Sequence, residues 1–239
     1  MNETPTSPNA RSPSPAPWIR EHWYIACEAK RLKRNRPLSI VICEVPLVLF
    51  RDESNRAVAL EDRCPHRNAP LSRGKICDGL IECCYHGWRF DARGSCRYVP
   101  ALAEGSPMPA DLAKVPVYGV IEKDGFIWIC PASKAPSGEP FSIPHFADPA
   151  FGRLYLGEIE IRASLLACVD NFLDVCHTRF IHGNLARVGP MKKISVIIRK
   201  SPNAVEIEYL DEPKPSGLLF RLFTPRDRKI RHTDRFLAR

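Results

Sequence analysis

The stretch CPHRNAPLSRGKICDGLIECCYHGW, Cys64–Trp88, decides how the N-terminal part of this 239-residue chain folds. It places Cys64 and His66 in one loop as C-x-H, and Cys83 and His86 in a second loop as C-x-x-H. Each loop follows a run that is typical of a strand and is itself followed by turn-forming residues. Two loops that each offer one thiol and one imidazole predict a metal centre to which both contribute.

The distribution of the ligands indicates which metal centre this is. A zinc finger usually takes two cysteines from one knuckle and two histidines from the other. Here each loop carries one of each, which suits a [2Fe–2S] cluster whose two irons have different ligands. One iron is then held by Cys64 and Cys83, and the other by His66 and His86. Neutral imidazole lowers the negative charge of the cluster and makes an added electron easier to hold. The pattern predicts an electron relay, with zinc or buried thiols as alternatives.

Short runs of β-branched and aromatic residues surround the two loops and predict an all-β domain over residues 18–135. A Pro- and Ser-rich tail, 1–17, precedes it and is expected to be disordered. The stretch Pro131–Pro149 is interpreted as a connector. The expected strands lie in Trp23–Ala29, Leu38–Val45, Pro46–Asp52, Glu53–Asp62, Leu80–Cys84, Val115–Ile121, Phe126–Cys130 and Leu154–Ile161.

A helical pattern begins beyond the connector. Apolar residues in LLACVDNFLDVCHTRFI, Leu165–Ile181, recur at three- and four-residue spacing, which predicts a helix. The runs KISVIIRK (Lys193–Lys200) and AVEIEYLDE (Ala204–Glu212) predict a hairpin, and GLLFRLFTP (Gly217–Pro225) one more strand. These elements indicate a helix-plus-antiparallel-sheet domain over 150–239, so the whole chain is expected to be of the α+β class.

Composition limits the classes of function. The net charge of +8 is densest at Lys30–Arg36 and Arg226–Arg231, which suits a solvated face, nucleic-acid binding or docking of an acidic electron-transfer partner; we favour the first. No apolar run reaches the roughly 20 residues of a membrane-spanning helix, and the N-terminus lacks the apolar core of an export signal. We expect a cytoplasmic protein that binds neither membrane nor nucleic acid, with ten cysteines that are ligands or thiols rather than disulfides.

A second candidate site lies in DNFLDVCHTRFIHG (170–183). On the predicted helix, Asn171, Asp174 and His177 lie three apart and can point toward one interior position. His182 is five further on, so it reaches that position only if the helix ends, loosens or bulges first. A single histidine beside an apolar face is more often a core residue. The set of Asn171, Asp174, His177 and His182, downstream of an iron–sulfur motif, favours a mononuclear iron site.

The cluster motif, Cys64, His66, Cys83 and His86, resembles that of the Rieske family, and the segments LEDRCPHRNAPLSRGK and CCYHGWRFDARGSC resemble the Rieske non-haem iron oxygenases. Cys84 cannot form C-x-x-H with His86 and stands where the family commonly has proline, so we interpret it as a non-ligand. High-potential respiratory Rieske proteins carry a disulfide beside the cluster, and the corresponding positions here hold Ala69 and Tyr85. The resemblance therefore implies a cluster of the lower-potential oxygenase type.

The pattern N-x-x-D-x-x-H-x-x-x-x-H is similar to the mononuclear-iron motif of that family. It implies that His177 and His182 ligate Fe(II), that Asp174 bridges a neighbouring subunit's cluster histidine to His177, and that Asn171 lies near the iron. The resemblance further implies a homotrimer, a flavin- or ferredoxin-type reductase using NAD(P)H, and oxidation of a small aromatic substrate by O₂. The opening WYIACEA…PLVLFRDESNRAVALEDRCPHR looks most like the vanillate O-demethylase and phthalate dioxygenase type, which favours monooxygenation or O-demethylation.

The resemblance departs from the family at one ligand. The family's carboxylate ligand lies far downstream of the second histidine, and nothing before Arg239 matches it. Asp227 and Asp234 come too early in a basic context, and we expect both to be solvated charges. We therefore expect an oxygenase truncated at its C-terminus. A Rieske electron-transfer protein without the mononuclear iron is the second hypothesis, and a zinc- or nucleic-acid-binding module is the third.

Overall fold

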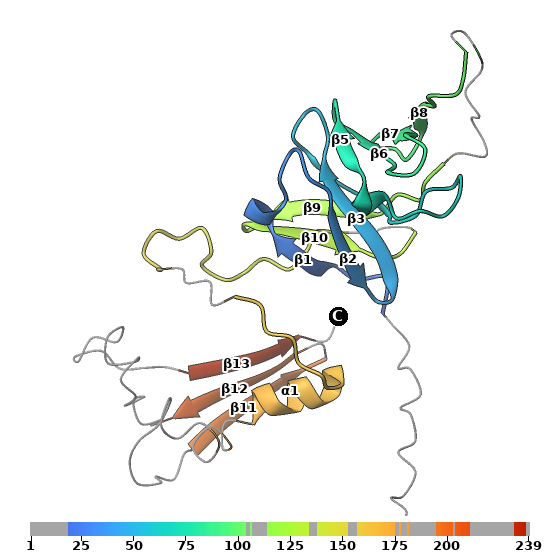
Figure 1. Cartoon of the computed structure of the whole chain (residues 1–239). Helices are drawn as coiled ribbons and strands as arrows, with labels where there is room; N and C mark the ends of the chain where they lie inside the picture. Colours follow the sequence, from blue (N-terminus) through green and yellow to red (C-terminus); the bar gives the residue numbers. More distant parts are fainter. Residues whose placement is uncertain are drawn as a thin grey trace, which may run out of the picture. The chain divides into compact units, whose positions relative to one another are not determined.

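The structure is a computed structural model that describes residues 19–103, 106, 114–133, 138–152, 157–174, 177, 181, 195–202, 204–210 and 232–237. The chain divides into two compact units, Met1–Leu154 and Tyr155–Arg239, called here the N-terminal and C-terminal units (Figure 1). The expected disordered tail 1–17 and the expected strand 217–225 lie outside the described residues. Within the described parts of the chain, no helix combines the length and the apolar character required to cross a membrane.

Short antiparallel strands build the N-terminal unit, in sheets of order β1-β10-β9, β2-β3-β4 and β5-β6-β7-β8 (Figure 1). Two single-turn 3₁₀ helices, η1 (Ala29–Arg31) and η2 (Leu71–Arg73), interrupt the connections. The strands are β1 Tyr24–Glu28, β2 Leu38–Ile42, β3 Val45–Arg51, β4 Ala57–Glu61, β5 Lys75–Cys77, β6 Leu80–Glu82, β7 Arg89–Phe90, β8 Cys96–Tyr98, β9 Gly119–Lys123 and β10 Phe126–Cys130.

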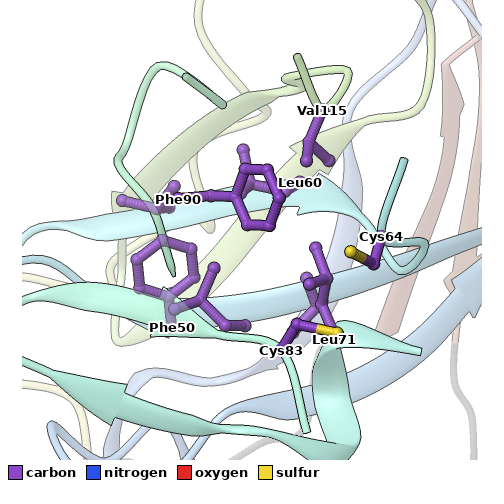
Figure 2. Close-up of a cluster of buried hydrophobic side chains, with 10 residues drawn as sticks. Phe50, Leu60, Cys64, Leu71, Cys83, Phe90 and Val115 are labelled. Carbon is purple, nitrogen blue, oxygen red and sulfur yellow. The ribbon is translucent and has the colours of Figure 1, made fainter. Parts of the chain in front are cut away.

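Strand β3 lies between two hydrophobic cores. Successive side chains of a strand point to opposite faces, so Leu47 and Leu49 enter one core with residues of β1 and β10. Val48 and Phe50 enter the other core, which contains Cys64 (Figure 2). All four of these apolar side chains are fully buried. The middle sheet is thereby covered on both faces, which explains why β3 is apolar at nearly every position rather than at every second one.

The segment before β9 joins the middle sheet to the β1-β10-β9 sheet. The amide of Glu61 donates to the carbonyl of Pro116 at 2.9 Å, and that of Tyr118 to Ala59 at 3.0 Å, around a bridge between Leu60 and Val117. A strand was expected over Val115–Ile121. The structure instead starts β9 at Gly119, because the preceding residues pair with β4 and not with β10.

The C-terminal unit contains one described helix and one described sheet. Helix α1 (Leu165–Leu173) begins at Ser164, whose hydroxyl accepts a hydrogen bond from the amide of Ala167 at 3.2 Å. The sheet has the order β11-β12-β13 (Figure 1). The expected hairpin is present, and the expected α+β class is confirmed. The strands are β11 Ser195–Ser201, β12 Ala204–Leu210 and β13 His232–Leu237.

Three expectations for this part of the chain were wrong or incomplete. The helix expected to run to Ile181 ends at Leu173, Asp174 is extended, and helical conformation returns at the isolated described residues His177 and Ile181. Residues 157–161 form no strand, although one was expected there. Strand β13 was not expected, because its sequence is rich in charge and lacks a clear apolar alternation.

Candidate metal centre

The first loop of the candidate centre is closed by Cys64. Its amide donates to the carbonyl of Ala69 at 2.8 Å, and its carbonyl accepts from the amide of Asn68 at 2.8 Å. Asn68 has φ 59°, a left-handed conformation that asparagine adopts more readily than most residues. The base of the loop is held by Asp62, whose carboxylate accepts hydrogen bonds from the amide and the hydroxyl of Ser72 at 2.7 and 2.6 Å.

The second loop repeats this backbone design. The amide of Cys83 donates to the carbonyl of Trp88 at 2.8 Å, and its carbonyl accepts from the amide of Gly87 at 3.1 Å. Gly87 occupies the place that Asn68 has in the first loop, with φ 70°. A Cβ at Gly87 would lie 3.0 Å from Cγ of Pro100, so both the backbone conformation and the space favour glycine. The backbones of the two loops therefore have the same hydrogen-bond pattern around their candidate cysteine ligands.

The two candidate thiol ligands are buried together. Cys64 and Cys83 are each 2% exposed and belong to the same core as Leu71 (Figure 2). Burial raises the pKa of the Cys64 thiol to about 11; hydrogen bonds from the His66 and Arg67 amides oppose this rise, and contact with Cys83 adds to it. Without metal the thiol is therefore neutral. A metal bound there would take the place of the thiol proton, and the same two amides would stabilise the thiolate sulfur.

The two candidate histidine ligands also form a pair. The rings of His66 and His86 have centroids 4.6 Å apart at an angle of 54°. Trp88 stacks on His66, and Tyr85 lies against His86 with centroids 3.9 Å apart. Desolvation lowers the pKa of His66, and the nearby His86 and Arg67 lower it further. The imidazole is thus held in the neutral form that binds metals.

One nitrogen atom of this pair, Nδ1 of His66, is buried without a hydrogen-bond partner in the described residues. A buried polar atom without a partner is costly and rare in native proteins. A metal held at Nδ1 would satisfy this atom, so the residues present fit a metal-bound histidine at this position.

The candidate donors lie in two pairs. In the parts of the chain that the structure describes, no three His, Cys, Asp or Glu side chains are arranged to hold one ion. The donors form a pair of thiols and a pair of imidazoles, which is what the two irons of a [2Fe–2S] cluster need. Cys84 is exposed, whereas Cys83 is buried with Cys64, and this favours Cys83 as the ligand.

The second candidate site lies after α1. Asp174 caps the helix, with its amide donating to the carbonyl of Asp170 at 2.9 Å, while Asn171 is an exposed residue of the last turn. The expectation that Asn171, Asp174 and His177 share one continuous helical face was wrong, because the helix ends before Asp174. His182 lies outside the described residues, so its position relative to His177 stays a prediction.

Asp174 and His177 are nevertheless in contact. Nδ1 of His177 hydrogen-bonds to the backbone carbonyl of Asp174, and it lies 3.7 Å from the Asp174 carboxylate. The contact engages Nδ1, so a metal would bind through Nε2. The carboxylate of Asp174 is 56% exposed and the ring of His177 20% exposed, so the acid remains accessible from outside.

The sequence did not reveal the residues that hold the first site together. Trp88 was part of the motif HGW, yet only the structure shows its stacking on His66. The hydrogen bonds between Asp62 and Ser72 join two segments ten residues apart, and neither residue belongs to the ligand pattern. Only the position of Asp62, two residues before the first ligand, could have drawn attention to it.

Comparisons with known proteins agree with this geometry. Residues 22–119 match the Rieske [2Fe-2S] domain. The dicamba O-demethylase oxygenase component of Stenotrophomonas maltophilia is 36% identical over 169 residues, which cover 69% of this chain and 48% of that protein. The vanillate O-demethylase oxygenase subunit of Pseudomonas sp. (strain HR199 / DSM 7063) is 32% identical over 165 residues, which cover 68% of this chain and 44% of that subunit.

A solved structure extends the similarity beyond the cluster domain. The crystal structure of dicamba monooxygenase bound to dicamba matches with a TM-score of 0.76 and 29% identity, covering 87% of this chain and 61% of that chain. The match to the two curated relatives spans about half of their length. The paired loops, the matching domain and these relatives agree with one another: residues 22–119 belong to the Rieske [2Fe-2S] domain family, and the chain is similar to the oxygenase components that carry this domain.

Proposed function

We propose that this chain is an oxygenase component that passes electrons through a [2Fe–2S] cluster to a mononuclear Fe(II), where O₂ oxidises a small aromatic substrate. The observation that carries the proposal is the pairing of thiols and imidazoles on two matching loops. When bound, the cluster supplies one-electron transfer and the iron supplies the activation of O₂. In this proposal Cys64 and Cys83 hold one cluster iron, and His66 and His86 hold the other.

The residues around the proposed cluster site hold its candidate ligands in position. Trp88 fixes the plane of His66, and the closed loop hydrogen bonds fix the two cysteine backbones. The core around the thiols excludes water from one side, while His86 is exposed on the other. An exposed imidazole can exchange a proton with solvent when the cluster changes its charge. We assign His86 the role of the ligand through which proton and electron leave together.

At the second site, His177 and His182 would hold the mononuclear iron. Asp174 would orient His177 through its contact with Nδ1, as outer ligands of metal sites commonly do. Its exposed carboxylate would accept a hydrogen bond from a cluster histidine of a neighbouring subunit, which requires a homotrimer or a comparable assembly. Asn171 would lie near the iron without binding it. In this proposal the third iron ligand is a carboxylate.

The relatives support the proposed reaction class and partners. Two of the curated relatives are named O-demethylases, which favours O-demethylation or monooxygenation of an aromatic substrate over dihydroxylation. Electrons would come from NAD(P)H through a flavin- or ferredoxin-type reductase. None of the nine cysteines in the described residues forms a disulfide, which supports the proposal of a cytoplasmic location.

The test begins with the metal content of the purified chain. A [2Fe–2S] cluster alone gives iron and acid-labile sulfide in equal amounts, and a filled mononuclear site adds half as much iron again. We expect the excess of iron, and the release of formaldehyde from methoxylated aromatic acids when reductase and NAD(P)H are added. Equal iron and sulfide without turnover would favour the electron-transfer protein. Zinc in place of iron would overturn the proposal.

Two neighbouring cysteines provide a matched pair of variants. Cys83→Ser should abolish the visible absorption of the cluster, because serine cannot replace a buried thiolate ligand. Cys84→Ser should leave the absorption unchanged, since Cys84 is exposed and its sulfur lies 4.0 Å from the carbonyl of Pro70. The reverse result would move the ligand assignment to Cys84.

A further inference from the structure

A basic groove lies on the N-terminal unit. It has a volume of about 890 Å³, and its lining includes Lys30, Arg31, Lys33, Arg36, Ser39 and Ser72. None of its described lining residues is acidic or aromatic. Most of the groove's charge comes from the first of the two basic runs of the sequence; the second, Arg226–Arg231, lies outside the described residues.

The fold holds the basic run on the surface. Leu32 is 3% exposed and anchors the run in the core. The buried guanidinium of Arg51 donates to the carbonyl of Leu32 at 2.9 Å and to that of Ala29 at 3.1 Å. The residues on either side of this anchor therefore project outward. Lys33 and Arg36 are exposed, and neither forms an ion pair with the described residues, so their charge is not neutralised locally.

The wall of the groove is bonded to the first ligand loop. Ser39 and Ser72, which both line the groove, donate from their hydroxyls to the carboxylate of Asp62 at 3.2 and 2.6 Å. Asp62 immediately precedes the loop that carries Cys64. Leu71, the neighbour of Ser72, lies in the core with Cys64 and Cys83 (Figure 2). A molecule in the groove is thus connected to the thiol side of the cluster site through a short series of bonds and packed side chains.

We propose that this groove docks the acidic one-electron carrier protein that reduces the cluster. The proposal rests on the proposed function and adds the entry surface for the electron. One electron leaves the reduced carrier, which is oxidised by one unit, and the oxidised cluster gains that electron; no covalent bond forms or breaks. Opposite charges steer the encounter and set the orientation. If the electron enters from the thiol side of the cluster, the exposed His86 remains available for its transfer to the mononuclear iron.

The chemistry of the groove favours an acidic protein over a nucleic acid. Single-stranded nucleic acids are bound by aromatic side chains on which the bases stack, together with basic residues. The groove offers basic residues without such a platform. The groove is also connected to the cluster site, which would allow a bound electron carrier to reduce the cluster. The same connection would serve no purpose for a bound polynucleotide.

The experiment compares two double charge reversals in the full chain. Lys33→Glu with Arg36→Glu changes the groove, and Arg93→Glu with Lys114→Glu makes the same charge change at exposed residues that do not line it. The probe is an acidic plant-type [2Fe–2S] ferredoxin. Stopped-flow absorption gives the rate of cluster reduction by the reduced ferredoxin, and calorimetry gives the affinity for the oxidised ferredoxin, which requires no turnover.

We expect the groove variant to lose at least about tenfold in the second-order reduction rate at low salt, with a parallel loss of affinity. The control variant should change by less than about threefold, and the difference should shrink as salt screens the charges. Both variants should keep the cluster spectrum. Equal losses in both variants, or no loss in either, would overturn the groove as the docking site. Tighter binding of a single-stranded oligonucleotide than of the ferredoxin, abolished by the groove variant, would also overturn it.

The result remains informative about each proposal separately. A chain that assembles no cluster fails the proposed function, whereas its affinity for ferredoxin still reports on the groove. A chain with a normal cluster whose reduction is indifferent to the groove charges keeps the proposed function and loses only the docking site.

Discussion

The imidazole of His66 stacks on the indole of Trp88, with ring centroids 4.6 Å apart and planes within 10° of parallel. The same histidine carries the buried Nδ1 atom that lacks a partner. Trp88 therefore fixes the direction in which this atom faces. The indole belongs to the second loop and the imidazole to the first, so the stacking also ties the two loops together.

Replacing Trp88 tests this positioning role. Trp88→Ala should remove a ring contact worth about 0.5–1.5 kcal/mol beyond its buried area and should allow the His66 ring to rotate. We expect a lower unfolding temperature and broadened EPR lines of the reduced cluster. Trp88→Phe keeps an aromatic face and should restore most of both properties. An Ala variant with an unchanged spectrum would show that the stacking does not orient the ligand.

The matching turns of the two loops give a second prediction. Gly87→Ala places a Cβ at φ 70° and 3.0 Å from Pro100, which should cost about 1–2 kcal/mol of unfolding free energy. Asn68→Gly, at the equivalent place in the first loop, should change the unfolding free energy by less than about 1 kcal/mol, because both residues tolerate this conformation. Guanidinium unfolding measures both. A Gly87→Ala variant as stable as the parent would contradict the account.

Arg51 provides a test of the fold behind the site. Its buried guanidinium donates to the carbonyls of Ala29 and Leu32 and pairs with Glu122 at 2.9 Å. Arg51→Met leaves these acceptors without their donors, and we expect a loss of about 3 kcal/mol in unfolding free energy. The loss should extend to the groove, because the same bonds anchor the basic run.

The control for Arg51 is the exposed Arg56. Its side chain is 76% exposed and pairs at 2.8 Å with the buried Asp52, whose carboxylate also accepts a hydrogen bond from the backbone amide of Arg56. Because that backbone bond remains, Arg56→Met should cost about 1 kcal/mol, less than Arg51→Met. Urea unfolding of the two Met variants compares the unfolding free energy lost at a buried arginine with that lost at an exposed arginine nearby in the sequence. Equal losses would mean that the hydrogen bonds of the buried Arg51 contribute no more than the ion pair of the exposed Arg56.

The pH dependence of stability should report on Glu82. Burial opposes the charge of this carboxylate, but hydrogen bonds from Arg89 at 2.7 Å and from Lys75 at 3.2 Å lower its pKa below the usual 4.5. Because the folded pKa lies below the unfolded value, the stabilisation is present above pH 4.5 and is lost as the pH falls through the folded pKa.

Glu82→Gln should therefore be less stable than the parent at neutral pH, and the gap should close progressively in acid. Thermal unfolding across this pH range is the measurement. A constant gap at every pH would indicate that the loss comes from packing rather than from the charge of the carboxylate.

How much the sequence predicts depends on the range of the interactions. Strand β10 was predicted with both ends correct, because the turn residues Asp124 and Gly125 and the proline after Cys130 mark its limits locally. The short strands β5, β7 and β8 were not predicted, since two or three residues carry no readable periodicity. The end of α1 at Leu173 was missed because neither glycine nor proline marks it.

The same limit applies to the candidate site. The thiols and imidazoles could be recognised from the sequence, because the C-x-H and C-x-x-H spacings are typical of metal ligands. The stacking of Trp88 on His66 and the tie from Asp62 to Ser72 could not, because they depend on how separate loops pack. The groove was visible only as a basic run, and its connection to the ligand loop required the structure.

The most direct test of the central claim is pulsed EPR on the reduced full chain labelled with ¹⁵N-histidine. We expect a [2Fe–2S] signal of low average g-value, coupled to the nitrogens of two imidazoles. One coupling should disappear in a His66→Cys variant and the other in a His86→Cys variant. A reduced cluster without histidine coupling, or a chain that binds only zinc, would contradict the assignment of His66 and His86 to one iron and of Cys64 and Cys83 to the other.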